Sequence, residues 1–396
     1  MKELPLQILN NYNKGRAIKD KRLACLAPFN SMYFLPEGRV IPCCYNRGFD
    51  YGTYPENNLH DVWFGDKALQ FRNWIRENKF HDGCSLCVDQ MRAGNNEGVH
   101  TRMFDFDDSR MLTNIKADEK ITYEHLKAIK HYPEILEFEL DITCNLECIM
   151  CHGNHSSLIR KNRENRPALK NPYDKNFVEQ LREFIPHVKT ARFLGGEPFL
   201  SDIYYDIWEL FGQMNPEAEI HITTNATIYN GRVRDLLNRL NVNIILSIDS
   251  FVKETYEAIR LNAKADKVFA NIESFAEYSR SKGKRMCITI CPMKQNRLEI
   301  PDIVEFCNQK DYMLYINTVI WPETTALRFM TVEEMEQTLL CWKKAKLSNV
   351  TAQHRHNNEQ LNGLTNQLQL WLNDKRGPKT IWSKIKETLP FKLTQG

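Results

Sequence analysis

The chain has 396 residues, which is long for one ordinary domain and suggests two or three folding units. Its 53 Lys and Arg residues exceed its 50 Asp and Glu residues by only 3 charges, too few to indicate a nucleic-acid partner, and its 42% hydrophobic content is typical of a globular protein. No apolar run approaches the roughly 18 residues of a membrane span, and the first residues lack the apolar stretch of a signal peptide, so we expect a cytoplasmic protein with no membrane partner.

Residues 1–95 are rich in Cys, Gly, Pro, Asn and aromatic residues and carry one clear helix signal, at residues 59–78. Their cysteines are Cys25, Cys43, Cys44, Cys84 and Cys87. Because cytosolic thiols are kept reduced, these cysteines favour a metal site over disulfides. A loop-rich segment with little apolar core is expected to need that metal for folding. Spacing alone leaves zinc and a four-thiolate iron-sulfur cluster open, with zinc the simpler choice.

Residues 96–134 are predicted to form a helical connector. In residues 135–322, short apolar strands alternate with helical stretches, and the strands are expected at residues 134–142, 190–196, 219–225, 243–249, 285–292 and 312–321. Such alternation predicts an α/β fold with a parallel sheet, and six units can curl into a partial (β/α)6 barrel. Residues 323–396 are predicted to be a helical extension, in which Thr331 and Glu334 form a capping-box pattern.

The strongest chemical signal is a cysteine triplet directly after the first barrel strand. Cys144, Cys148 and Cys151 have C-x3-C-x2-C spacing. Three thiolates on one short loop can hold three corners of a cubane iron-sulfur cluster and leave the fourth iron open for a ligand. A zinc site or three unrelated thiols is the alternative that the spacing leaves open.

The triplet and the segments after it resemble the radical S-adenosylmethionine (SAM) superfamily, whose signature is this loop after the first strand of a partial barrel. Gly195, Gly196 and Glu197 follow the second strand, as does the family's GGEP segment that meets the amino group of SAM. The resemblance covers roughly residues 135–322. It implies a [4Fe-4S] cluster that binds SAM, reductive cleavage of SAM, abstraction of hydrogen from a substrate carbon, and a flavodoxin- or ferredoxin-type reductant.

The same resemblance implies further SAM contacts. Arg260 is expected near the SAM carboxylate, although the Gly that often follows this Arg in the family is Leu261 here. Met150 is expected against adenine, with simple core packing as the alternative. Strand alternation independently places polar side chains inside the barrel at the ends of the third and fourth strands, where related enzymes contact the ribose. These residues are Thr223, Asn225, Ser247 and Asp249.

The amino-terminal run CLAPFNSMYFLPEGRVIPC, followed by LHDVW and CSLC, resembles the SPASM/Twitch auxiliary-cluster domain of radical SAM enzymes. That domain usually follows the barrel, whereas here it precedes it. The resemblance implies a second [4Fe-4S] cluster, with zinc still open. Cys43 is preferred to Cys44 as a ligand because it follows Pro42, as the family's ligand does. The implied ligands are Cys25, Cys43, Cys84 and Cys87.

Three further residues are candidates for the reaction itself. Alternation places Cys291 inside the barrel at the carboxyl end of its strand, where a thiol could return hydrogen to a substrate radical, although a packing cysteine is the simpler interpretation. Glu139 and Asp141 share one face of the first strand and could bind a hydroxyl or take a proton, with a salt bridge inside the barrel as the simpler role. His152 and His155 are expected to make ordinary loop hydrogen bonds.

The substrate class rests on the weakest argument. SPASM/Twitch enzymes act on peptides and on carbohydrates, and peptide-modifying members often carry a leader-binding domain, for which the 24 residues before Cys25 are too few. We therefore expect epimerisation of a sugar or another small polar molecule. Radical oxidation and peptide modification are the alternatives, and a non-catalytic, zinc-stabilised binding protein is the competing class.

Overall fold

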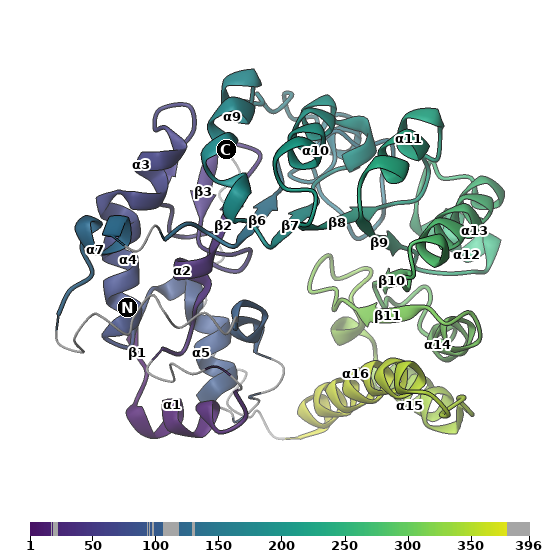
Figure 1. Ribbon diagram of the computed structural model, residues 1–396. Helices are drawn as coiled ribbons and strands as arrows, with labels where there is room; N and C mark the ends of the chain where they lie inside the picture. The colour runs from purple at the N-terminus through teal and green to yellow at the C-terminus, as the bar shows by residue number, and fades with distance from the viewer. Residues whose placement is uncertain are drawn as a thin grey trace. The chain divides into compact units, whose positions relative to one another are not determined.

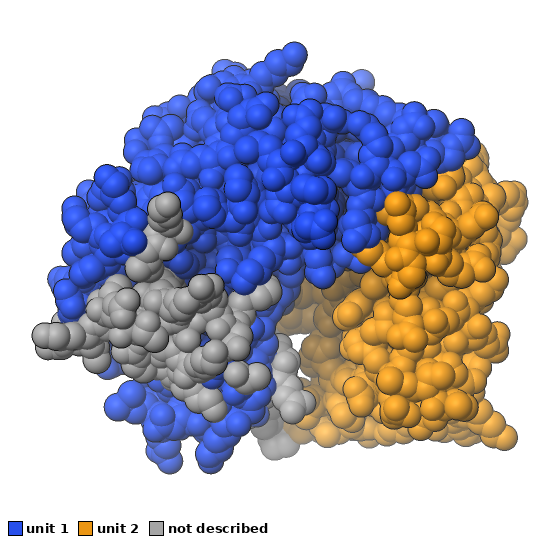
Figure 2. Space-filling view, in the orientation of Figure 1, with its two compact units in different colours: residues 1–145, 152–224, 230–243 blue, residues 146–151, 225–229, 244–396 orange. Residues whose placement is uncertain are grey.

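The computed structural model describes residues 1–16, 18, 23–92, 94, 96, 99–105, 119–128 and 131–377. Parts of the predicted connector and the end of the predicted extension lie outside these residues. The chain forms two compact units, which Figure 2 shows in different colours. Unit 1 contains Met1–Asn145, His152–Thr224 and Asn230–Asn243, and unit 2 contains Leu146–Cys151, Asn225–Tyr229 and Ile244–Gly396.

Three of the predicted strands form the parallel sheet of unit 1 (Figure 1): β6 (Ile135–Phe138), β7 (Thr190–Phe193) and β8 (Glu219–Thr224). β7 pairs in parallel with β6 on one side and with β8 on the other. The helices between and after them are α8 (Ser157–Asn162), α9 (Lys175–Gln180), α10 (Asp202–Met214) and α11 (Gly231–Arg239). Phe193 packs on Trp208 of α10, so one face of this sheet is covered by that helix.

The other predicted strands build the sheet of unit 2. β9 (Val242–Ser247) begins in unit 1 and continues into unit 2, where β10 (Cys287–Ile290) pairs in parallel with β9 and with β11 (Met313–Ile316). The helices of this part are α12 (Lys253–Ile259), α13 (Ala265–Ser281) and α14 (Ile300–Gln309). All six predicted strands are present, each shorter than its apolar run, and the predicted α/β fold with a parallel sheet is confirmed.

The amino-terminal segment extends the sheet of unit 1, which the sequence did not indicate. β2 (Ser31–Phe34) pairs in parallel with β6, and β3 (Arg39–Ile41) and β4 (Gly52–Thr53) follow in antiparallel order. Unit 1 also contains β1 (Lys2–Glu3), β5 (Lys79–Phe80), α1 (Leu6–Asn13), α2 (Ala27–Asn30), α5 (Ser85–Arg92) and α7 (Tyr123–Ala128).

Two expectations for this segment need correction. The single helix expected at residues 59–78 is divided into α3 (Leu59–Phe64) and α4 (Asp66–Arg76), because the chain turns at Gly65, where a Cβ would lie 2.2 Å from the Asp61 carbonyl oxygen. The segment also has more apolar core than expected. Its aromatic side chains are fully buried at Phe29, Phe34 and Trp63. They pack because β2 joins the larger sheet, a pairing between residues far apart in the sequence.

The carboxyl-terminal helices belong to unit 2. α15 (Val332–Lys344) begins with the predicted capping box, in which Thr331 Oγ1 accepts the Glu334 N–H and the Glu334 carboxylate accepts the Thr331 N–H. α16 (Ala352–Arg376) packs against β11, α14 and α15 (Figure 1). None of the helices in the described residues combines the length and the hydropathy needed to cross a bilayer.

Candidate functional site

The four amino-terminal thiols that were predicted as ligands lie together in unit 1. Cys25 lies before α2, Cys43 follows β3, and Cys84 and Cys87 lie at the start of α5. Electrostatic interactions join Cys25 to the other three thiols and join Cys84 to Cys43 and Cys87. Across the described ranges, no three Cys, His, Asp or Glu side chains are close enough to hold a single metal ion.

The surroundings of these sulfurs suit thiolates bound to a cluster. Burial raises the pKa of all four thiols, to about 12 for Cys43 and to about 11 for Cys87, so positive charge from a bound metal is needed to hold them deprotonated at neutral pH. Each sulfur also accepts backbone hydrogen bonds. The donors are Ala27 for Cys25, Tyr45 and Asn46 for Cys43, His81 for Cys84, and His100 and Thr101 for Cys87. The donor set therefore fits a four-cysteine iron-sulfur cluster.

Cys44 has different neighbours from Cys43. Its sulfur lies 3.2 Å from His100 Nε2, and its side chain packs against the buried cluster of Tyr33, Leu35 and Ile41. The Cys44 thiol is therefore already in contact with the His100 side chain. The choice of Cys43 over Cys44 as the fourth ligand stays a prediction.

The cysteine triplet lies on the loop between β6 and α8. Cys144 belongs to unit 1, and its N–H donates to Ser157 Oγ at 3.2 Å. Cys148 and Cys151 belong to unit 2 and are joined by a turn in which the Cys151 N–H donates to the Cys148 carbonyl oxygen at 3.0 Å. Within unit 2, the N–H groups of Glu147 and Ile149 donate to the backbone around Arg260 at 3.1 and 2.9 Å. Cys148 is therefore held beside Arg260.

Arg260 offers a buried guanidinium next to Cys148. Its Nη1 lies 4.0 Å from Cys148 Sγ, and its Nη2 lies 2.8 Å from Asp249 Oδ2. Its Nε is buried and has no hydrogen-bond partner among the described residues. A buried donor without a partner is costly, and a carboxylate would satisfy it. Arg260 therefore fits the predicted contact with the carboxylate of SAM.

Asp249 is fully buried, and both of its oxygens contact the protein. Besides the pair with Arg260, Asp249 Oδ1 accepts the N–H of Cys291 at 2.8 Å. These contacts order Arg260 and the end of β10. The contact between Asp249 and ribose stays a prediction.

The glycine pair after β7 packs tightly on the strand that leads to the cysteine loop. Gly195 has φ of +113°, and a Cβ on it would lie 2.5 Å from the Asp141 carbonyl oxygen. A Cβ on Gly196 would lie 2.2 Å from the Thr143 carbonyl oxygen. Glu197 is directed into its own turn, where its carboxylate accepts the Phe199 N–H at 3.2 Å and the Thr224 hydroxyl at 2.7 Å. In unit 1 this segment therefore needs both glycines in order to fold against the residues before Cys144.

The remaining predicted SAM contacts have ordinary partners. Thr223 is half-buried on β8, and Ser247 Oγ lies 3.3 Å from Thr289 Oγ1. Asn225 Oδ1 accepts the backbone N–H of Thr227 at 3.0 Å and its hydroxyl at 2.6 Å. These contacts leave the SAM roles of the three polar residues as predictions.

Met150 packs against a buried apolar cluster of unit 2, formed by Ile259, Met293, Val319 and Ala326. The contact matches the core-packing alternative for this residue. Cys291 packs on the same cluster, and electrostatic interactions join its thiol to Cys148 and Cys151. The structure therefore places Cys291 beside the predicted SAM-cluster loop, as its position at a strand end suggested.

Glu139 is the centre of a buried polar network that sequence analysis found only in part. Its carboxylate accepts the Tyr33 hydroxyl at 2.6 Å and contacts Arg47 Nη2 and His155 Nδ1, each at 2.7 Å. Burial alone would raise the pKa of Glu139, but His155, Arg47 and Tyr33 together lower it to about 2. These contacts form a salt-bridge network, and a role of Glu139 in the reaction stays a prediction.

Asp141 is also occupied by nearby side chains. Its Oδ1 accepts the Thr143 N–H at 2.8 Å and the Thr143 hydroxyl at 2.7 Å, and its Oδ2 accepts the Ser201 hydroxyl at 2.9 Å. These bonds shape the turn that leads from β6 to Cys144. A catalytic role for Asp141 stays a prediction.

A row of polar residues crosses the face of the unit 1 sheet opposite α10, and sequence analysis missed most of it. Glu137 lies opposite Tyr33 on one neighbouring strand and opposite Arg192 on the other. Arg192 in turn lies opposite His221 on the next strand. Asn243 continues the row, since its Nδ2 lies 3.5 Å from His221 Nε2. Strand alternation in the second barrel strand was the signal that could have identified Arg192.

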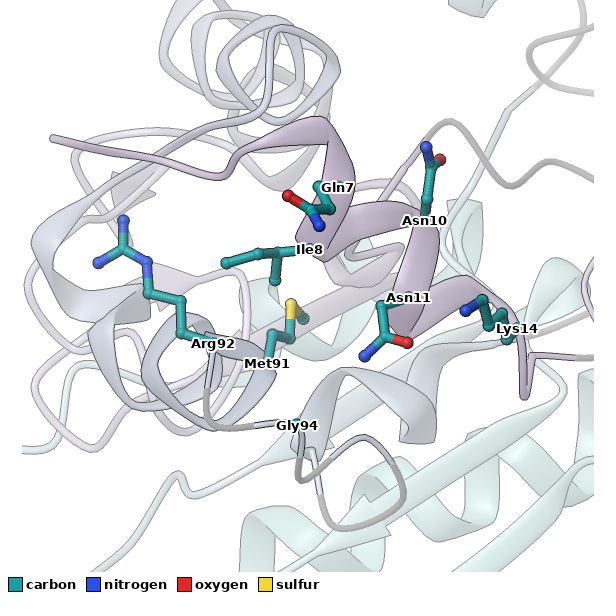
Figure 3. Close-up of a pocket in the computed structure, with 8 residues that line it drawn as sticks. All are labelled: Gln7, Ile8, Asn10, Asn11, Lys14, Met91, Arg92 and Gly94. Atoms are coloured by element: carbon teal, nitrogen blue, oxygen red, sulfur yellow. The ribbon is translucent and has the colours of Figure 1, made fainter.

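A separate hollow of about 560 Å³ lies between α1 and α5. Figure 3 shows Ile8 and Met91 pointing toward one another, with Arg92 and Lys14 on opposite sides. None of the predicted site residues lines this hollow. It is distinct from both cysteine loops.

Comparison with known proteins gives two family matches. A sequence model of the radical SAM superfamily matches residues 142–307, and one of the SPASM iron-sulfur cluster-binding domain matches residues 25–88. The first includes the cysteine triplet and the second includes all four thiols of the amino-terminal set.

Curated relatives match a smaller part of the chain. The GTP 3′,8-cyclase of Listeria welshimeri is 26% identical over 168 residues, which are 42% of this chain and 48% of the cyclase. The GTP 3′,8-cyclase of Clostridium botulinum strain Hall is 28% identical over 147 residues, or 36% of this chain and 44% of the cyclase. The chain thus spans about half the length of the curated relatives it matches.

Solved structures show weaker similarity. Native anSMEcpe with bound AdoMet has a TM-score of 0.39 and 16% identity, and covers 52% of this chain and 58% of that chain. Streptococcus suis SuiB bound to S-adenosylmethionine has a TM-score of 0.41 and 19% identity, and the match covers 76% of this chain and 63% of that chain. The cysteine loops and the two family matches together indicate a radical SAM domain at residues 142–307, preceded by an iron-sulfur cluster-binding SPASM domain at residues 25–88, which implies a SAM-binding [4Fe-4S] cluster and auxiliary iron-sulfur chemistry.

Proposed function

We propose that this enzyme abstracts hydrogen from a carbon of a small polar molecule, such as a sugar or amino-sugar derivative, and epimerises that carbon. The observation that carries the substrate class is the polar row across the unit 1 sheet. Its members Glu137, Arg192 and His221 present a carboxylate, a guanidinium and an imidazole at one level of three neighbouring strands. Such side chains bind hydroxyl, amino and charged groups and do not suit an apolar ligand.

The exposed fractions within the row support a binding role for two of its members. The Arg192 and His221 side chains are 21% and 26% exposed. The Glu137 side chain is nearly buried, and its Oε2 lies 3.4 Å from Arg192 Nη1. Glu137 therefore orients the guanidinium. The exposed parts of Arg192 and of His221, whose Nε2 lies 3.6 Å from Glu219 Oε2, present nitrogen donors to solvent. Those donors are the contacts that we propose for the substrate.

The cofactor supplies the radical chemistry when SAM is bound at the reduced cluster. Arg260 is proposed to bind the carboxylate of SAM through its buried donor, and Gly195 and Gly196 to let the backbone approach its amino group. Cys291 is proposed to return a hydrogen atom to the substrate radical, and the cysteine radical that remains is restored to the thiol by an electron from the reductant and a proton from solvent. The support for this role is the place of Cys291 at the end of β10, beside Cys148 and Cys151 in unit 2.

A reaction in deuterium oxide tests the proposal. The reconstituted enzyme is incubated with SAM, a reductant and mixtures of amino sugars and nucleotide sugars, with GTP and a synthetic peptide as competing probes. GTP is included because of the similarity to GTP 3′,8-cyclases. We expect an inverted sugar carbon that carries solvent deuterium, because a thiol exchanges its hydrogen with solvent.

Two cysteine variants complete the test. Cys291→Ser should still abstract hydrogen but should yield no inverted product, whereas Cys287→Ser, at the other end of β10, should behave as wild type. A product without solvent deuterium, together with normal turnover by the Cys291 variant, would make oxidation the better assignment. Turnover of GTP or of the peptide alone would refute the sugar substrate.

A further inference from the structure

Asn46 contacts two of the four thiols that are proposed to hold the auxiliary cluster. Its side-chain Nδ2 lies 3.4 Å from Cys84 Sγ. Its backbone N–H bonds the Cys43 sulfur and lies 3.2 Å from the Cys43 carbonyl oxygen. Cys43 follows β3 and Cys84 precedes α5, so this residue links two segments that are far apart in the sequence.

The environment of Asn46 fixes its side chain in this orientation. The residue is 1% exposed, and a Cβ on Gly83 would lie 2.0 Å from its Oδ1. The Oδ1 atom is buried and has no hydrogen-bond partner among the described residues. Burying an amide oxygen in this way costs free energy, and the interaction gained is the N–H directed at Cys84.

We propose that Asn46 is a positioning residue of the auxiliary cluster: it joins the Cys43 and Cys84 segments, and its N–H group stabilises the reduced state of the cluster. Reduction adds negative charge to a centre whose sulfurs are already negative. An N–H dipole that points at a sulfur stabilises the more negative state and so raises the reduction potential.

Asn46 differs from the other donors to these sulfurs. Backbone amides supply the hydrogen bonds to Cys25, Cys43 and Cys87, whereas Cys84 also accepts one from the Asn46 side chain. A side-chain donor can be removed without changing the backbone. The inference rests on the proposed ligand set, and a double variant of Cys84 and Cys87 tests that set separately.

The experiment measures the reduction potential of the auxiliary cluster in the full chain. Asn46→Ala and Asn46→Asp are reconstituted without oxygen, assayed for iron and sulfide, and titrated with a reductant under EPR. The auxiliary signal is the one that does not change when SAM is added. The control is Asn57→Ala, because Asn57 is an exposed residue of the same domain whose Oδ1 accepts the Thr53 N–H at 3.1 Å.

We expect both Asn46 variants to have a more negative midpoint, while the Asn57 variant keeps the wild-type value. At the wild-type midpoint potential, the ratio of reduced to oxidised cluster should fall about tenfold, which is about 59 mV for a one-electron couple. If neither Asn46 variant takes up the auxiliary cluster and the control does, the joining role is supported. If both Asn46 variants have the full iron content of wild type and an unchanged midpoint potential of the auxiliary cluster, the proposal is overturned.

The double variant Cys84→Ala with Cys87→Ala separates this outcome from an error in the ligand set. Loss of about four iron atoms per chain from that variant supports the assignment of Cys84 and Cys87 as cluster ligands. Unchanged iron content shows that the ligand set is wrong, and the proposal for Asn46 then fails with it. Lost iron together with unchanged Asn46 potentials overturns the role of Asn46 alone.

Discussion

Asp249 and Arg260 form a buried ion pair in which Asp249 Oδ2 lies 2.8 Å from Arg260 Nη2. The Asp249 side chain has no exposed surface, and that of Arg260 is 7% exposed. Arg260 in turn lies beside Cys148, so the carboxylate orients a cation next to the proposed cluster ligand. The pair links the end of β9 to the end of α12 within unit 2.

Asp249→Asn should destabilise the protein strongly, because it leaves the charge of Arg260 buried without its partner. Removing one member of a buried pair costs about 3 to 5 kcal/mol. Urea unfolding followed by circular dichroism measures the loss. The control is Asp266→Asn, which breaks an exposed pair with Lys253 and should cost less than about 1 kcal/mol. Equal unfolding free energies for the two variants would contradict the prediction.

Replacing Cys144, Cys148 and Cys151 together by Ala should abolish reductive cleavage of SAM and leave the amino-terminal cluster in place. The reason is that the triplet places three thiolates on one loop and leaves the fourth iron open, while the four amino-terminal thiols lie on three other segments of the chain. Wild type should contain about eight iron atoms per chain and the variant about four. Product analysis for 5′-deoxyadenosine gives the second measurement, and retained cleavage would refute the assignment.

The fold was predictable because its signals are local. The strand at residues 219–225 alternates apolar and polar residues, and the structure buries Ile220 and Ile222 while leaving His221 and Thr223 half-buried. The cysteine spacing in the triplet likewise reports on one short loop. Such patterns depend on neighbouring residues and can be interpreted from one sequence.

The features that the sequence did not reveal depend on residues far apart in the chain. The pairing of β2 with β6 joins Tyr33 to Glu137, and the partners of Glu139 come from three segments. Alternation identified Glu139 as polar and buried but could not supply Arg47. The choice between a free carboxylate and an ion pair therefore required the structure.

The Glu139 network predicts a specific dependence of stability on pH. The pKa of Glu139 is about 2 in the folded protein, below the value of about 4.3 of an unperturbed Glu. A lowered carboxyl pKa contributes stability above the unfolded pKa, and this contribution is lost as pH falls toward the folded pKa. At pH 7, Glu139→Gln should therefore lower the free energy of unfolding by about 3 kcal/mol.

Urea unfolding at several pH values measures this effect. The deficit of Glu139→Gln relative to wild type should persist from pH 7 to pH 5 and should shrink below about pH 4.3. The control is Glu37→Gln, because Glu37 is an exposed residue that pairs with Arg39. A deficit that does not shrink between pH 4.3 and pH 2 would show that Glu139 does not act as an ionised carboxylate in the folded state.

The last prediction concerns the free edge of β11, which α16 covers with amide side chains. Asn357 Oδ1 accepts the Leu314 N–H at 2.9 Å, and Asn357 Nδ2 donates to the Tyr312 carbonyl oxygen at the same distance. Gln353 Nε2 donates to that oxygen at 2.6 Å, and Gln360 Oε1 accepts the Ile316 N–H at 3.3 Å. The helix thereby satisfies backbone groups that a further strand would otherwise pair.

Asn357→Leu should leave the buried Leu314 N–H without an acceptor and cost about 1 to 3 kcal/mol. Asn362→Leu is the matched control, since Asn362 is exposed on the same helix and should change stability by less than about 0.5 kcal/mol. Because unpaired strand edges pair with other chains, the Asn357 variant should also associate at high protein concentration, which light scattering detects. An Asn357 variant that is as stable and as monodisperse as the control would show that the amide side chains of α16 do not protect this edge.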